Sequence, residues 1–266
     1  MGQAKQRSNA VKQCIYCSDV NNLTDEHVLP YGLGGDLVLK KASCQNCAKV
    51  TSQLEQRLLR GHWWPYRRYL GMKSRRPSEQ DANLPVLLKR EFTEDRKAEL
   101  PINEQSIALV FELDPPSIFR GEYRSDAPAA PRVFMKQLGP PPKAVLIDGN
   151  SHQLLPDEKL EIPVNFDAGD LCRFLAKVAH GYAIHRRGLS AFEEFFLPEI
   201  ILGKTQGALT FVGGNSSPFI GPRLFGSGIN SLSDRVNGEF LTVYIQLFRD
   251  SGAPPPIYEI VVGRLR

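Results

Sequence analysis

The sequence predicts an α+β protein: a small metal-holding unit at the N-terminus, then a larger domain with an antiparallel sheet and one long amphipathic helix. Three observations support this. Four cysteines form two CxxC pairs near the N-terminus, apolar runs alternate with Pro- and Gly-rich turns further on, and one stretch repeats apolar residues at helical spacing. With 266 residues and 42% hydrophobic content, the chain can form one large or two modest domains with real cores.

The two CxxC pairs, Cys14 with Cys17 and Cys44 with Cys47, predict a structural zinc site. In each pair two thiolates reach one ion from a single tight turn, and two pairs complete the tetrahedral four-sulfur shell that structural zinc prefers. The alternatives are four unrelated buried cysteines or two redox pairs. A redox role is disfavoured because neither pair starts a helix after a buried strand.

An acid followed by a histidine, Glu26-His27, lies between the cysteine pairs. An extended run over residues 28–30, a glycine-rich turn over residues 32–35 and a second apolar run over residues 37–39 follow, which predicts a hairpin. A helix is expected over residues 48–60. A lone histidine is more often structural than catalytic, but a histidine on this hairpin would face the start of the helix. Because its ordinary pKa is about 6.5, it would be mostly neutral at pH 7 and able to accept a proton.

Residues 12–60 resemble the HNH endonucleases of the His-Me (ββα-metal) finger superfamily, in the variety whose finger is held by four zinc-binding cysteines. The matching features, in order, are the first CxxC, Glu26-His27-Val28-Leu29-Pro30, Gly34-Gly35, the apolar run and the second CxxC. The resemblance implies a ββα-metal finger that hydrolyses DNA phosphodiester bonds. His27 would be the general base, and Glu26 would bind a catalytic Mg²⁺ or Mn²⁺ beside the structural Zn²⁺.

The sequence departs from the family at two positions. The family's central Asn has at best Asp36 nearby, and the second metal ligand, normally His or Asn directly after the last cysteine, is Ala48. Glu55, Thr51 and Asn46 are the candidates to replace that ligand. The alternative function is therefore a non-catalytic zinc-finger module that binds nucleic acid or another protein.

Basic residues are concentrated in the first part of the chain. Residues 1–80 carry 13 Lys/Arg and 6 Asp/Glu, whereas the other residues carry 20 and 23, within a total net charge of +4. This asymmetry suits a DNA partner. The candidate phosphate-binding residues are Lys40, Lys41, Arg57, Arg60, Arg67, Arg68, Lys73 and Arg75. The aromatic residues at 63, 64, 66 and 69 either pack against sugars and bases or dock the finger onto the second domain.

Residues 81–266 read as one α+β domain without a recognisable catalytic motif. Strands are expected over residues 84–92, 106–113, 132–135, 143–147, 208–212, 241–248 and 257–262. A helix is expected over residues 167–187, ending at Gly188, and a shorter one over residues 190–196. This domain would determine substrate choice, regulation or assembly, and a regulatory partner or small ligand is a further possibility.

The predicted organisation is a flexible basic leader (1–12), the finger (13–60), a basic and aromatic connector (61–80) and the domain at 81–266. No signal peptide and no apolar run long enough to cross a bilayer is visible, so we expect a cytoplasmic protein with no membrane partner. Reduced thiols in that compartment suit zinc better than disulfides.

Overall fold

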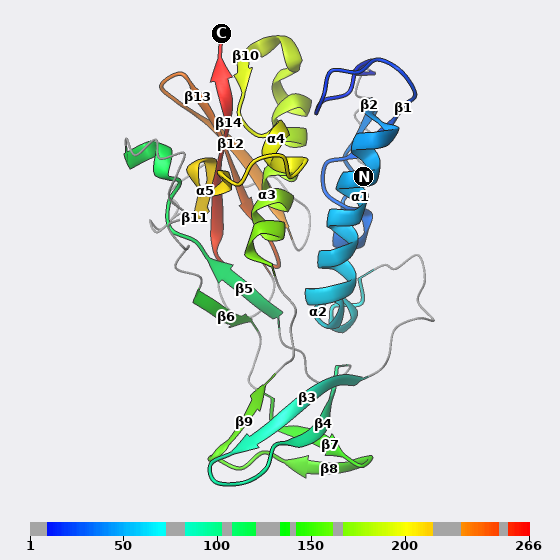
Figure 1. Ribbon diagram of the computed structural model, residues 1–266, viewed down its shortest axis with the longest axis vertical. Coiled ribbons are helices and arrows are strands. Elements are labelled where there is room, and N and C mark those ends of the chain that lie inside the picture. Colours follow the sequence, from blue (N-terminus) through cyan, green and yellow to red (C-terminus); the bar gives the residue numbers. More distant parts are fainter. Residues whose placement is uncertain are drawn as a thin grey trace, which may run out of the picture.

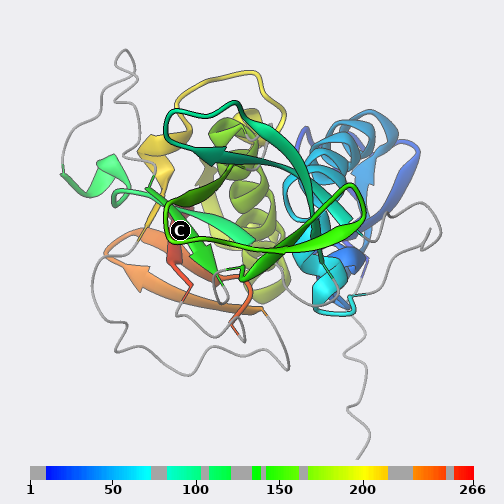
Figure 2. The same ribbon diagram turned by 90° about the horizontal axis from the view of Figure 1, so that it is seen from below.

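The long helix α3 (Ala168–Arg187) lies between two layers of the structure, with a sheet of C-terminal strands on one side and the N-terminal part of the chain on the other (Figures 1 and 2). The computed structural model describes residues 10–72, 83–102, 108–120, 134–138, 142–161, 167–214, 230–249 and 255–266. Of the 20 residues of α3, 14 are buried. Such a helix needs apolar or pairable side chains all round, not only along one stripe.

Local sequence sets both ends of α3. The side chain of Asp167 accepts a hydrogen bond of 2.8 Å from the backbone N–H of Gly169, as an N-cap does. The last turn is basic, which complements the negative end of the helix dipole. Gly188 follows with φ of 76°, a conformation that glycine adopts without strain. The predicted helix over residues 167–187 is thus confirmed.

The C-terminal sheet has the strand order β10-β14-β13-β12, and β11 also pairs with β14. All these pairs are antiparallel. The strands are β10 (Phe192–Phe195), β11 (Val212–Gly214), β12 (Ser231–Asn237), β13 (Phe240–Gln246) and β14 (Ile257–Leu265). Two short helices, α4 (Pro198–Ile201) and α5 (Ala208–Phe211), lie in the connections.

The N-terminal unit, which we define as residues 10–72, begins with an antiparallel strand pair, β1 (Leu23–His27) and β2 (Val38–Cys44). A 3₁₀ turn (Tyr31–Leu33) connects them. The helix α1 (Gln45–Arg57) follows directly, then a π-helical turn (Leu58–His62) and α2 (Trp64–Tyr69).

The N-terminal unit and the layers around α3 share one hydrophobic core. Trp63 and Tyr66 are 2% and 1% exposed and belong to it. The ring of Trp63 meets Phe174 of α3 edge-on at 5.2 Å, and both Trp63 and Tyr66 meet Phe248. Trp63 and Tyr66 therefore dock the N-terminal unit onto the rest of the chain and are not available to pack against sugars and bases.

A second five-stranded sheet, with the order β8-β7-β4-β3-β9, has a small core of its own (Figure 1). Its strands are β3 (Asn83–Arg90), β4 (Arg96–Pro101), β7 (Ala144–Ile147), β8 (Asn150–Gln153) and β9 (Glu158–Glu161). A separate pair joins β5 (Ala108–Glu112) to β6 (Phe134–Leu138), and a 3₁₀ turn covers Ser117–Arg120.

The structure confirms the mixed fold with antiparallel sheets, and it corrects three expected elements. The first strand of the N-terminal hairpin is β1, which ends at His27, and residues 28–30, expected to be extended in that hairpin, follow it outside the strand. Instead of a helix over residues 190–196, a 3₁₀ turn (Leu189–Ala191) leads into β10, because this segment pairs with the edge of β14. Residues 208–211 are helical, and only Val212 and the two glycines after it enter the sheet. Within the described residues, no helix has the length and apolar character needed to cross a membrane.

The contact between α3 and the N-terminal unit predicts an effect of side-chain size at Gly181. A Cβ atom at this position would lie 3.4 Å from Cγ2 of Val28 and 3.6 Å from its Cα. Gly181→Leu should therefore lower the free energy of unfolding by about 1–3 kcal/mol, because the added methyl groups overpack the interface. Chemical denaturation of the whole chain measures this.

The matched control is Gly61→Leu, since a Cβ at Gly61 meets no atom within 4 Å. Equal losses in the two variants would show that the effect comes from replacing glycine and not from the interface.

Candidate metal centre and the adjoining charged cluster

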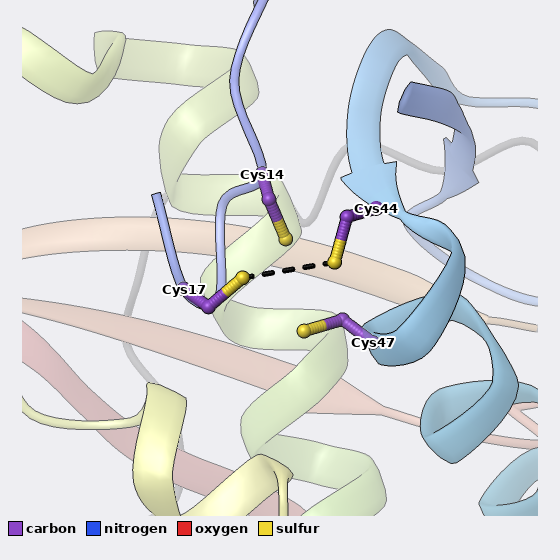
Figure 3. A group of neighbouring side chains, drawn as sticks. All are labelled: Cys14, Cys17, Cys44 and Cys47. Carbon is purple, nitrogen blue, oxygen red and sulfur yellow. Dashed lines mark hydrogen bonds between the residues drawn. The ribbon is translucent and has the colours of Figure 1, made fainter. Parts of the chain in front are cut away.

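The four cysteines of the two CxxC pairs converge on one point (Figure 3). Cys14 and Cys17 lie on the loop before β1, Cys44 ends β2, and Cys47 is in the first turn of α1. Their sulfur atoms all lie within 4.8 Å of one another, and the Sγ atoms of Cys17 and Cys44 are 3.6 Å apart. Tetrahedral zinc with Zn–S bonds of about 2.3 Å places its sulfurs about 3.8 Å apart. The four cysteines can therefore hold a structural ion such as zinc.

The backbone around Cys14 prepares this geometry. The N–H of Cys14 donates to the carbonyl of Asp19 at 2.7 Å, and the N–H of Ser18 donates back to the carbonyl of Cys14 at 2.9 Å. Ile15 donates to the carbonyl of Ala42 on β2 at 2.8 Å. These bonds bring the first pair of thiols to the end of the hairpin, where the second pair begins the helix.

The expectation that neither pair starts a helix after a strand is therefore wrong for Cys44 and Cys47, which end β2 and open α1. The convergence of all four sulfur atoms still favours a metal site over a redox pair.

An irregularity in the β1–β2 pairing brings Glu26 into the interior. The register shifts between Thr24 and Glu26, and Asp25 stays outside, where it accepts hydrogen bonds from the side chain of Lys40 and the backbone of Lys41. Glu26 is only 6% exposed. A buried carboxylate needs a partner of opposite charge.

The partner of Glu26 is Lys177 on α3. Its Nζ lies 2.9 Å from Oε1 of Glu26 and 2.7 Å from Oε1 of Glu55 on α1. The same ammonium donates to the carbonyl oxygen of His27 and contacts that of Val28 at 3.4 Å. We call Lys177, Glu26, Glu55 and the two carbonyl groups the lysine cage. The side chain of Lys177 is 1% exposed.

Charge keeps this lysine protonated. Burial by itself would lower the pKa of Lys177, but the carboxylates of Glu26 and Glu55 outweigh it, so the pKa lies above its ordinary value. Burial and the same charges also raise the pKa of the nearby Tyr16 hydroxyl. Burial first, and then the charges of Glu26 and Glu55, raise the pKa of Tyr16 well above its ordinary value, so that it stays neutral.

The lysine cage does not fit the divalent ion that the HNH resemblance implies. Glu26 and Glu55, the two predicted ligands, do lie together, but the ammonium occupies the position where they converge. A hard divalent ion needs carboxylate oxygens at about 2.0–2.6 Å and cannot share that position with Nζ. Among the described residues, the four cysteines form the only group of three or more His, Cys, Asp or Glu ligand atoms close enough for a metal.

His27, the predicted general base, is the last residue of β1 and is half-buried. Its carbonyl group, rather than its imidazole, contacts Lys177. Its Nδ1 atom is buried and has no hydrogen-bond partner among the described residues. The imidazole is thus beside the lysine cage but is not one of its members.

The roles of Lys177 and His180 were not expected from the sequence. His180 is completely buried and donates from Nε2 to the carbonyl of Ile15, at 2.7 Å, inside the first CxxC loop. Its ring packs edge-on against Phe195. Burial lowers the pKa of His180 to about 4, so it is neutral near pH 7. No local pattern indicated either role, because both residues make contacts with segments 150 or more positions away in the sequence.

Two of the predicted phosphate-binding arginines are engaged inside the protein. Arg67 is 6% exposed and donates to the carbonyls of Gly32 at 2.6 Å and Leu59 at 2.8 Å. Arg57 makes a two-point bond to Asp170 of α3, at 2.5 and 2.8 Å, with half of its side chain exposed.

The other candidates are more accessible or lie elsewhere. Lys40, Lys41 and Arg60 are exposed and Arg68 is half-buried. Lys73 and Arg75, like residues 1–9 of the expected leader, lie outside the described residues.

No family model, curated protein or solved structure matches this chain. Its function is therefore inferred from its own side chains and their arrangement.

The four-cysteine cluster predicts one zinc ion per chain and dependence of the fold on it. Replacing Cys47 by Ser should abolish zinc retention and destabilise the N-terminal unit, because structural zinc supplies on the order of 10 kcal/mol of folding free energy. Metal analysis and circular dichroism measure both effects. Cys172→Ser is the control, since Cys172 is buried in α3 away from the cluster. Full zinc content in Cys47→Ser would contradict the assignment.

His180 predicts a loss of stability on acidification. Its folded pKa of about 4 lies below its unfolded value of about 6.5, so the unfolded chain binds the extra proton first. Protonation of His180 in the unfolded chain leaves the free energy of unfolding unchanged above about pH 6.5. As the pH falls from 6.5 towards 4, it lowers the free energy of unfolding by about 3 kcal/mol. Denaturation of wild type and His180→Gln at each pH isolates this contribution, because zinc loss affects both proteins. Parallel stability curves for the two proteins would contradict it.

Proposed function

We propose that this chain is a nucleic-acid-binding protein, in which a zinc-held unit of the ββα-metal type contacts the phosphates of double-stranded DNA without cutting it. The observation that carries this proposal is the division of charge in the N-terminal unit. Glu26 and Glu55 face inwards to Lys177, whereas Lys40 and Lys41 are exposed.

The inward acids leave a basic outer surface. Residues 10–72 contain eight Lys/Arg and five Asp/Glu, and two of the five acids belong to the lysine cage. The exposed acids are Asp25, which is paired with Lys40, and Asp36. Exposed Lys and Arg side chains bind DNA by neutralising phosphates and releasing counterions. The exposed basic residues are Lys12, Lys40, Lys41, Lys49 and Arg60. Arg57 is also exposed, but its guanidinium is bonded to Asp170.

A second candidate is the metal-dependent HNH endonuclease. The order of elements favours it: a strand pair, a histidine at the end of β1 directly after a buried acid, and a helix that begins at the second cysteine pair. In this function His27 would act as general base. Because the cage does not fit a divalent ion, we rank this candidate second and assign no catalytic step to an ion there.

The binding proposal predicts a loss of affinity when exposed lysines of the hairpin are removed. Lys40→Ala/Lys41→Ala should weaken binding to a short DNA duplex and reduce the slope of log K against log salt by up to about 2, because about 0.9 counterions are released for each phosphate contact. Fluorescence anisotropy at several salt concentrations measures both quantities.

The matched control is Lys97→Ala/Lys159→Ala, which removes two exposed lysines from β4 and β9 of the other sheet. If Lys40→Ala/Lys41→Ala binds no more weakly than this control, or if wild type does not bind duplex DNA at low salt, the proposal is wrong.

A plasmid-nicking assay separates the two candidate functions. Zinc-loaded wild type with Mg²⁺ or Mn²⁺ should leave supercoiled DNA intact while still binding it. Nicking by wild type that disappears in His27→Ala would establish the second candidate in place of the first.

A further inference from the structure

We propose that the ammonium of Lys177 is the resident cation of a site that would otherwise take a hard divalent ion, and that removing the amine converts this site into a binding site for Mn²⁺. This inference deepens the proposed function and rests on one part of it, namely that the lysine cage of the wild-type protein binds no metal ion. It assigns the cation to α3, far along the chain from the strand and helix that supply the oxygens.

The charged side chains of the lysine cage are largely buried and contact one another through the ammonium of Lys177. The side chains of Lys177, Glu26 and Glu55 are 1%, 7% and 20% exposed. The ammonium meets one oxygen from each carboxylate and the carbonyls of His27 and Val28. Carboxylate and carbonyl oxygens are the ligands that hard divalent ions prefer, so the acceptor set suits either kind of cation.

The segment that carries the ammonium is held in place by its neighbours. Asp170, two turns earlier on α3, binds Arg57 of α1, and His180, one turn later, binds the carbonyl of Ile15. Gly181 allows α3 to approach Val28 closely. Withdrawal of the amine would leave Glu26 and Glu55 without their positive partner at the edge of the core that α3 shares with the N-terminal unit. We therefore expect wild type to exclude divalent ions from the cage.

Charge explains why the cage requires a cation. Two carboxylates buried without a positive partner would be strongly destabilising, because their negative charge would be left uncompensated in the interior. Lys177→Ala removes Cγ, Cδ, Cε and Nζ, which leaves both space and negative charge. An added cation of suitable size should then bind and restore stability, because it binds the folded state alone.

The experiment uses the zinc-loaded full chain and titrates Mn²⁺, followed by the electron paramagnetic resonance signal of the free ion. Wild type should show no saturable site. Lys177→Ala should bind one equivalent, with an affinity at least about tenfold above that of Lys177→Ala/Glu26→Gln/Glu55→Gln, which lacks both charged ligands. The matched lysine control is Lys49→Ala, an exposed position on α1 that should behave like wild type.

Chemical rescue tests the same inference by stability. n-Propylammonium replaces the part of the side chain that Lys177→Ala lacks, and it should raise the melting temperature of that variant but not of wild type or of the triple variant. If Lys177→Ala is recovered folded only with Mn²⁺ or n-propylammonium, the inference is supported.

The inference is overturned if folded Lys177→Ala binds Mn²⁺ no better than the triple variant. It is also overturned if Lys177→Ala stays unfolded in both cations while the charge-free variant Lys177→Met/Glu26→Gln/Glu55→Gln folds, or if wild type binds Mn²⁺ through Glu26. Nicking is scored separately. Mn²⁺ binding by Lys177→Ala supports the assignment of Lys177 as the resident cation, whether or not this variant cleaves DNA. The DNA-binding function is tested separately, by the affinity measurements on the lysine variants.

Discussion

The burial of α3 on both sides is the constraint on which the rest of the structure depends. A helix with water on one side can leave its polar residues exposed, but the 14 buried residues of α3 cannot reach water, because a sheet covers one face and the N-terminal unit covers the other. A buried polar side chain on α3 therefore gains from a partner, although Nδ1 of His180 has none among the described residues. Asp170 bonds to Arg57, Lys177 to Glu26 and Glu55, and His180 to a backbone carbonyl.

These polar bonds specify how the two parts of the chain fit together more than they add stability. A buried ion pair contributes little net free energy, because desolvation offsets most of its attraction, yet breaking it is expensive. The shared apolar core supplies the favourable term, through residues such as Trp63, Tyr66 and Phe174. A shifted docking of α3 would keep much of that apolar contact but leave Lys177 or Glu26 unpaired, so the charged cluster selects one arrangement.

Features that depend on residues close together in the sequence were predicted correctly. The two CxxC pairs gave the sulfur cluster, and the apolar spacing over residues 167–187, with Gly188 after it, gave α3 and its end. The segments over residues 190–196 and 208–212 were misassigned. The first contains a strand instead of a helix because it pairs with the distant strand β14. In the second, only Val212 pairs with β14, and the residues before it are helical.

The lysine cage could not be predicted because it joins residues 150 positions apart in sequence, and Lys177 lies off the apolar stripe used to identify the helix. Glu26 and Glu55 were named as neighbours of a cation. The source of that cation was visible only in three dimensions. Arg67 looked like a surface residue in a basic run, but the π-helical turn and α2 direct it to internal carbonyls.

The hydrogen bond from His180 to Ile15 has a thermodynamic consequence for the cysteine cluster. Ile15 lies inside the loop that joins two of the sulfurs, so the loop geometry is held partly by a helix that begins more than 150 residues later. Linkage is reciprocal: if the packed helix favours the ion-binding shape of the loop, the bound ion favours the packed helix by the same free energy. Affinity for the ion is then a property of the folded chain, and a short peptide containing only the four sulfurs would hold it less tightly.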